Sequence, residues 1–71
     1  MTAAPFDLLA WRTALGWTQE RAARELEMTL TNYRELERGR RRIMPRVERL
    51  AGYVGEAELE ARRKFPNVRS T

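Results

Sequence analysis

The chain has 71 residues, of which 42% are hydrophobic, and it carries 14 Lys and Arg against 10 Asp and Glu, a formal net charge of +4. A chain this short forms one domain with a small core, because folding buries only roughly 60% of the surface that the unfolded chain exposes. The sequence has no cysteine and no histidine. This excludes a disulfide framework, a thiolate zinc site and the commonest catalytic base. We therefore expect no enzyme, no metal and no other cofactor.

No stretch approaches the roughly 18 apolar residues that a membrane span requires. The amino terminus also lacks the basic and then apolar plan of a signal peptide. We therefore expect a soluble, cytoplasmic protein without a membrane partner.

The positive charge is concentrated in the second half of the chain. Residues 1–37 carry a net charge of −2 and residues 38–71 a net charge of +6, and thirteen of the fourteen basic residues are arginine. The densest run, residues 38–49, holds six arginines and a single acid. Such a cluster is typical of a surface that binds a polyanion. A solvated basic loop and GC-rich codon usage are the alternatives.

Three short helices are predicted in the first half, and no convincing strand. The first begins near Pro5, has apolar residues at helical spacing and stops at Gly16. The second covers residues 19–27 and the third residues 30–38, each behind a threonine N-cap. Gly39 closes the third helix.

The second half of the chain predicts two further helices. After an arginine-rich loop over residues 40–44, Pro45 starts a helix that Gly55 ends or bends. A last segment, residues 56–64, has acids first and bases last, as the helix dipole favours. The final residues, 66–71, are expected to form a flexible tail.

The third predicted helix has one apolar side and one polar side. Leu30, Tyr33 and Leu36 fix the buried side on a helical wheel. The opposite side is a row of polar residues that suits the DNA major groove, which is about 12 Å wide. An ordinary solvated face has the same composition. The residues on the opposite side are Thr31, Arg34, Glu35 and Arg38.

Several motifs between residues 5 and 54 stand in a characteristic order and spacing. They are Arg12-Thr-Ala-Leu-Gly16-Trp-Thr18-Gln19-Glu-Arg-Ala-Ala23, Met28-Thr29, Tyr33, Leu36-Glu37-Arg38-Gly39, Pro45 and Leu50-Ala51. Together they resemble the Cro/repressor-type (Xre-like) helix-turn-helix family, although each alone is weak. The resemblance implies an all-α, five-helix bundle of the lambda-repressor type over residues 1–65. Residues 19–38 would be the helix-turn-helix and residues 30–38 the recognition helix.

The resemblance also implies roles for individual residues. In such proteins the glutamine that starts the second helix contacts the DNA backbone, a role that falls on Gln19. An arginine of the first helix pairs with a glutamate of the third, here Arg12 with Glu37. The wheel places Glu37 on the core flank beside Tyr33, where a charge needs a partner.

Two groups of DNA-binding residues are expected around the recognition helix. Leu30 is either a contact to a thymine methyl group or a leftover apolar residue. The base-reading residues are Leu30, Thr31, Arg34 and Glu35. The phosphate-binding residues are Thr18, Gln19, Asn32, Arg38, Arg40, Arg41 and Arg42.

The sequence departs from the family pattern at two positions. Many relatives have glycine where this chain has Glu27, so this residue either adopts a left-handed conformation, at about 1 kcal/mol, or the turn follows another path. Ala22 is smaller than usual, so a bulky aromatic residue has to fill the space beside it. We interpret Trp11 and Trp17 as core residues, with base stacking as the alternative.

We expect a sequence-specific regulator that binds double-stranded DNA, a repressor that acts as a homodimer on an inverted repeat. The expected dimer surface is Tyr53, Leu59 and Phe65, and no small-molecule ligand is evident. An antitoxin-like module that also binds a partner protein and an arginine-rich RNA-binding module remain the alternatives. An enzyme is disfavoured because the acids of residues 56–60 have no histidine or aspartate companion.

Overall fold

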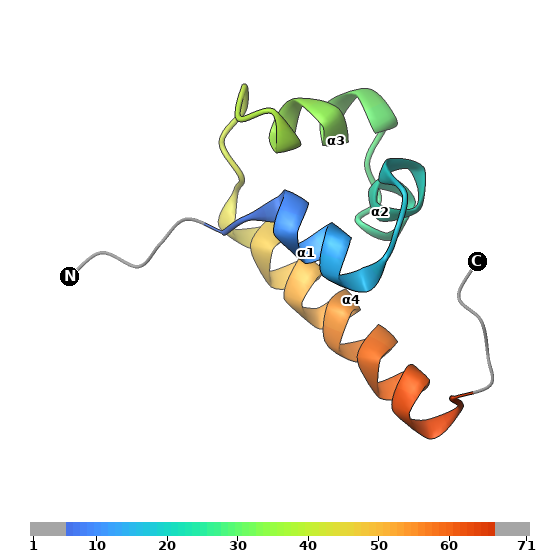
Figure 1. Ribbon diagram of the computed structural model, residues 1–71. Helices are drawn as coiled ribbons and strands as arrows, with labels where there is room; N and C mark the ends of the chain where they lie inside the picture. Colours follow the sequence, from blue (N-terminus) through green and yellow to red (C-terminus); the bar gives the residue numbers. More distant parts are fainter. Residues whose placement is uncertain (1–5, 67–71) are drawn as a thin grey trace.

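The computed structural model describes residues 6–66, and these fold into four helices without a strand (Figure 1). The helices are α1 (Leu8–Leu15), α2 (Gln19–Glu25), α3 (Leu30–Glu37) and α4 (Pro45–Lys64). Helix α1 packs against both α3 and α4, and α2 packs against α3. The prediction of an all-helical fold is confirmed for this part of the chain. The predicted tail lies, from residue 67 onwards, outside the described residues.

A polar side chain caps each of the first three helices. Asp7, Thr18 and Thr29 each accept a hydrogen bond from the backbone N–H three residues ahead, at 3.0–3.1 Å. These caps satisfy N–H groups that have no partner within the helix. Because Asp7 is the N-cap, α1 begins at Leu8 and not near Pro5, which itself lies outside the described residues.

Left-handed residues end the first three helices or follow them closely. Gly16 and Gly39 have φ of 72° and 77°, a conformation that glycine adopts without steric cost. Glu27 has φ of 58°, so the left-handed alternative holds at the turn between α2 and α3. The side chain makes this conformation unfavourable by about 1 kcal/mol. Helix α2 ends at Glu25, two residues before the predicted boundary.

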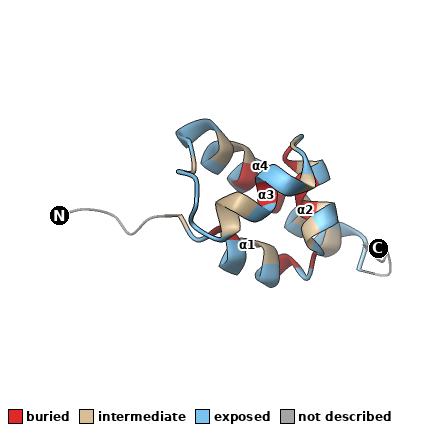
Figure 2. Ribbon diagram, turned by 90° about the horizontal axis from the view of Figure 1, so that it is seen from above, coloured by how far each residue is buried: buried red, intermediate tan, exposed pale blue. Residues whose placement is uncertain are grey.

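The core lies where α1, α2 and α3 meet the first half of α4, and the buried residues line the inner sides of the helices (Figure 2). Trp17 is only 5% exposed, and its ring meets that of Trp11 edge to face with centroids 5.6 Å apart. The guanidinium of Arg21 covers the Trp17 ring at 4.6 Å. Trp17 is therefore a core residue and its ring is not available for base stacking. The buried residues are Leu8, Leu15, Trp17, Ala22, Ala23, Leu26, Tyr33 and Ala51.

The two helices predicted after Pro45 are one continuous helix of 20 residues, so the prediction that Gly55 divides them is wrong. Gly55 is buried against Trp11, and a Cβ at Gly55 would lie 2.9 Å from Trp11 Nε1. That indole nitrogen donates a hydrogen bond to the carbonyl of Ala51, at 2.8 Å. Gly55 therefore provides room for α1 to approach α4. Because α4 runs through Gly55 without a break, residues 6–66 contain four helices and not the predicted five.

Arg62 attaches the second half of α4 to the rest of the domain. Its Nη2 donates to the carbonyl of Leu15 at 2.6 Å, and its Nε donates to Glu58 at 2.9 Å. The Leu15 carbonyl lies in the last turn of α1, where carbonyl groups lack partners within the helix. The arginine therefore caps α1 from a distance and favours the extension of α4 beyond Gly55.

The two glycines of α4 provide a matched test of this packing. We expect Gly55→Ala to destabilise the protein by about 1–3 kcal/mol, because the added methyl group displaces the Trp11 ring. Gly52→Ala meets nothing within 4 Å and should stabilise the protein by about 0.5–1 kcal/mol through helix propensity. Urea denaturation of both variants measures the difference. Equal effects of the two substitutions would contradict the packing role of Gly55.

Candidate nucleic-acid interface

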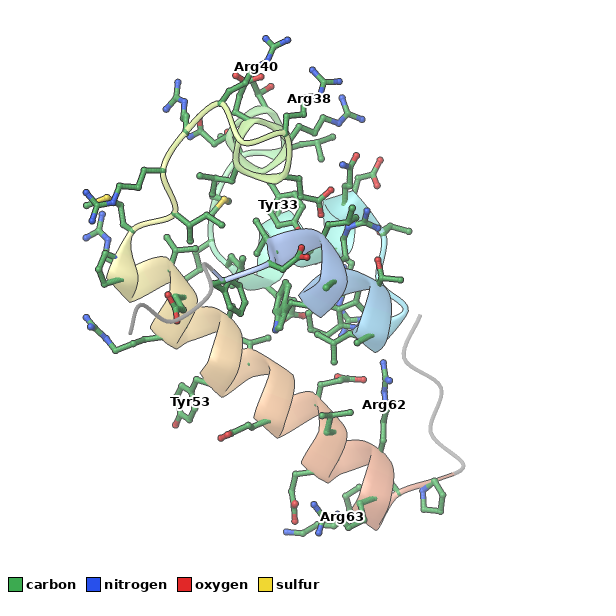
Figure 3. All side chains as sticks on the ribbon, turned by 60° about the vertical axis from the view of Figure 1, so that its left-hand side comes forward. Tyr33, Arg38, Arg40, Tyr53, Arg62 and Arg63 are labelled. Carbon is green, nitrogen blue, oxygen red and sulfur yellow. The ribbon has the colours of Figure 1, made fainter. Side chains whose placement is uncertain are left out.

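Helix α3 turns a row of polar side chains away from the core. Tyr33 is fully buried, whereas Thr31, Asn32, Arg34 and Arg38 are exposed. Glu35 and Leu30 are half-buried, so they stand at the edges of this row. Figure 3 shows Tyr33 pointing inward and Arg38 projecting outward. The outward and inward sides of α3 follow the periodicity that the sequence predicts.

An ion pair between α1 and α3 holds the inward side in place. Arg12 Nε lies 2.6 Å from Glu37 Oε2, and Arg12 Nη2 donates to the other carboxylate oxygen at 3.3 Å. The remaining Nη1 donates to the carbonyl of Trp17 at 2.9 Å. The two side chains are only 19% and 7% exposed, respectively. The pair therefore fixes the rotation of α3 about its own axis relative to α1.

Gln19 joins this ion pair to the outward row of α3. Its Nε2 donates to Glu37 Oε1 at 3.0 Å, and its Oε1 accepts from Arg34 Nε at 3.3 Å. The Glu37 carboxylate can only accept hydrogen bonds, so the NH2 group of the Gln19 side chain must face it. The amide oxygen of Gln19 therefore faces Arg34. Sequence reasoning gave Gln19 a phosphate contact and missed these two bonds, because helical periodicity carries no information on contacts between helices.

The shared environment shifts the pKa values of the buried groups. Burial alone raises the pKa of Glu37, but hydrogen bonds, first of all from Arg12, outweigh it and hold this pKa below its usual value. The bond to Glu37 raises the pKa of Arg12. Burial raises the pKa of Tyr33, and the neighbouring Glu37 carboxylate raises it further. The raised pKa keeps the Tyr33 hydroxyl neutral in the core, where it lies beside the Arg12–Glu37 pair.

A basic loop continues from the end of α3. Gly39 turns the chain, and the backbone N–H of Arg40 closes the helix end with a hydrogen bond to the Glu35 carbonyl at 3.0 Å. Arg38 and Arg40 project from the same end of the molecule (Figure 3). In the described part of the chain, no ion pair involves the four exposed arginines of this loop. They are Arg38, Arg40, Arg41 and Arg42, called the arginine loop below.

The remaining phosphate-binding candidates lie at helix starts. The Thr18 hydroxyl caps α2 and is exposed, and Gln19 is the first residue of that helix. The side chain of Asn32 is exposed in the first turn of α3. The N-terminus of each of these helices points free N–H groups and a partial positive charge outward, which suits phosphate oxygens.

The structure does not gather the predicted dimer residues into one patch. Tyr53 is 75% exposed, and Leu59 and Phe65 are also exposed. Tyr53 and Leu59 are six residues apart on α4, which at 3.6 residues per turn separates them by about 120° around the helix. Tyr53 points away from the other helices (Figure 3). A surface that used both side chains would have to wrap around α4.

We expect Glu37→Gln to destabilise the protein by about 3 kcal/mol at pH 7, because it leaves the Arg12 charge partly buried without its counter-charge. The pKa of Glu37 is lowered on folding, so the pair contributes fully above about pH 4.3, the ordinary value of a glutamate. This contribution is lost as the pH falls through the folded-state value. The difference between the proteins in urea denaturation should therefore shrink toward pH 3.

Glu60→Gln is the control for this measurement. Glu60 forms ion pairs with Arg63 and Lys64 but is about half exposed, so its removal should change stability little. A Glu37→Gln effect of the same size at pH 3 and pH 7 would show that the charge of Glu37 is not what stabilises the contact.

The segment that carries this site matches a known protein family. A family model described as helix-turn-helix matches residues 8–53, more than half of the chain and the whole segment from α1 to the middle of α4. No curated protein and no solved structure gives a significant match. The match agrees with the two consecutive helices α2 and α3, the short turn between them, in which Leu26 is buried, and the polar outer row. The chain belongs to the Cro/repressor-type (Xre-like) helix-turn-helix family of DNA-binding regulators.

Proposed function

We propose that the protein reads duplex DNA by placing α3 in the major groove while the arginine loop holds the adjacent phosphates. The observation that carries this proposal is that the exposed polar row of α3 leads directly into the arginine loop, whose four arginines form no ion pair with any residue that the structure describes. Phosphate contacts fix the register of a protein on DNA, and contacts to base edges select the sequence. The two sets of side chains supply these two kinds of contact.

Arg34 is the principal base-reading residue in this proposal. A guanidinium suits the two acceptors of guanine in the major groove, and each such bidentate contact discriminates by about 1–3 kcal/mol. The hydrogen bond from Arg34 to Gln19 restrains the side chain before DNA arrives, so less entropy is lost on binding. Thr31 contacts hydrogen-bond donors or acceptors on a base edge, and Glu35 accepts a hydrogen bond from the amino group of cytosine. Leu30 contacts a thymine methyl group.

The phosphate contacts come from the arginine loop and from two helix starts. Arg38, Arg40, Arg41 and Arg42 supply charge on one side of α3. Thr18, Gln19 and Asn32 supply hydrogen-bond donors at the N-termini of α2 and α3. Neutralising phosphates releases counterions, so binding weakens steeply with salt.

We further propose that the protein acts as a homodimeric repressor on an inverted repeat. One recognition helix reads only a few base pairs, and two-fold dimers of such domains bind half-sites about one helical turn apart. Tyr53 and Leu59 of α4, with Phe65 directly after it, supply exposed apolar surface for a dimer contact that wraps around this helix. A bound dimer blocks access to promoter DNA.

Arg34→Ala and Arg41→Ala should have different effects on DNA binding. We expect Arg34→Ala to weaken binding to the selected site by about 1–3 kcal/mol per subunit and to relax the preference at one base position. Arg41→Ala should weaken binding to all sequences alike and lower the salt slope by about 1 per contact removed. Selection of bound duplexes from random DNA, followed by titration at several salt concentrations, measures both effects. An unchanged preference in Arg34→Ala would contradict its base-reading role.

A further inference from the structure

A groove of about 680 Å³ opens between the start of α1, the end of α3 and the loop before α4. On the α3 side it is lined by Leu36 and Glu37, which belong to the inward side of that helix. It therefore does not overlap the outward polar row. Its volume lies within the range of about 300–1,000 Å³ that is typical of small-molecule sites.

Apolar side chains from three segments supply five of the eleven residues that line the groove. They are Phe6, Leu8 and Leu9 at the start of α1, Leu36 in α3 and Ile43 in the loop. Leu8 is buried, but Leu9 is 49% exposed although it stands beside the other four. The groove thus offers apolar surface to an occupant, which is the main source of affinity for small molecules.

Some charged groups at the groove have interaction partners among the described residues, and others form no ion pair there. Asp7 caps α1 and Glu37 is paired with Arg12, so both carboxylates already have partners. Arg41 and Arg42 line the groove and form no ion pair with any residue between 6 and 66. The one carboxylate left is Glu48, in the first turn of α4, where the helix dipole stabilises it. With two arginines against one carboxylate, the net uncommitted charge at the groove is therefore positive.

We propose that this groove binds a small amphipathic anion, a molecule with one carboxylate and an unbranched or aromatic apolar body. The body lies against Leu9, Leu36 and Ile43, and the carboxylate accepts hydrogen bonds from Arg41 and Arg42. Guanidinium groups match carboxylate oxygens in geometry and charge. Neither a bare anion nor an uncharged apolar molecule satisfies both parts of the groove.

Occupancy of the groove has a consequence for DNA, which rests on the proposed function. Arg41 and Arg42 are proposed phosphate contacts, and one guanidinium cannot hold a ligand carboxylate and a phosphate in the same geometry. The two ligands therefore bind antagonistically. Because this coupling is reciprocal, DNA weakens the binding of the anion by the same factor by which the anion weakens the binding of DNA.

Decanoate, with decan-1-ol and acetate as partial analogues, tests the binding site itself. Calorimetric titration of the full chain should show saturable binding of one decanoate per chain, with decan-1-ol and acetate at least tenfold weaker. Equal binding of decan-1-ol would overturn the role of the arginines. Equal binding of acetate would overturn the role of the apolar wall.

Leu9→Gln removes part of the apolar wall without touching a proposed DNA contact. It should weaken decanoate binding at least tenfold, whereas Met44→Gln should leave it unchanged, because Met44 is an equally exposed apolar residue that does not line the groove. Circular dichroism checks that both variants are folded. Unaltered decanoate binding by Leu9→Gln overturns the proposed site. So does a change in the sedimentation of Leu9→Gln, since the groove would then be a contact between two copies of the chain.

Competition with DNA separates this inference from the proposed function. Decanoate should lower the affinity for a selected duplex, and the duplex should lower the affinity for decanoate by an equal factor. A chain that binds decanoate and no duplex contradicts the proposed function but leaves the site intact. A chain that binds both ligands independently contradicts the coupling through Arg41 and Arg42.

Discussion

The carboxylate of Glu37 is the group on which the rest of the structure depends. It lies near the end of α3 with its side chain only 7% exposed, and an isolated charge in such a place is strongly unfavourable. Arg12 compensates it through two hydrogen bonds, and Gln19 adds a third. Only one rotation of α3 places Glu37 within reach of α1 and α2 while Tyr33 enters the core. This rotation is also the one that turns Thr31 and Arg34 outward.

A second constraint fixes the other side of α1. The Trp11 indole needs a hydrogen-bond acceptor once its ring is packed, and it finds the Ala51 carbonyl because Gly55 leaves the surface of α4 open. Helix α1 is therefore held to α3 by a charge and to α4 by an aromatic contact. In a chain too short for a large core, these two directional contacts specify an arrangement that apolar burial alone leaves loosely defined.

Local chemistry explains what was predictable from the sequence. The threonine N-caps and the glycines at 16 and 39 act within a few residues, so the starts of α2 and α3 and the ends of α1 and α3 follow from the sequence within a residue. The outward side of α3 follows from the spacing of Leu30, Tyr33 and Leu36. The contact between Gln19 and Arg34 and the role of Gly55 join segments far apart in the chain. A single sequence does not distinguish a glycine that ends a helix from one that, like Gly55, leaves space for a packed tryptophan ring.

The pairing of the arginines separates those that stabilise the fold from those that do not. Arg12 and Arg62 are partly buried and each bonds both a carboxylate and a backbone carbonyl of another segment. The arginine loop instead gathers four like charges within five positions, exposed and without ion pairs in the described part of the chain. Mutual repulsion makes such a cluster unfavourable for the isolated domain. Arg24, Arg46 and Arg49 are also exposed and form no ion pair among the described residues, so the density of its charges is what sets the arginine loop apart. This density is best explained by an anionic partner that supplies counter-charges.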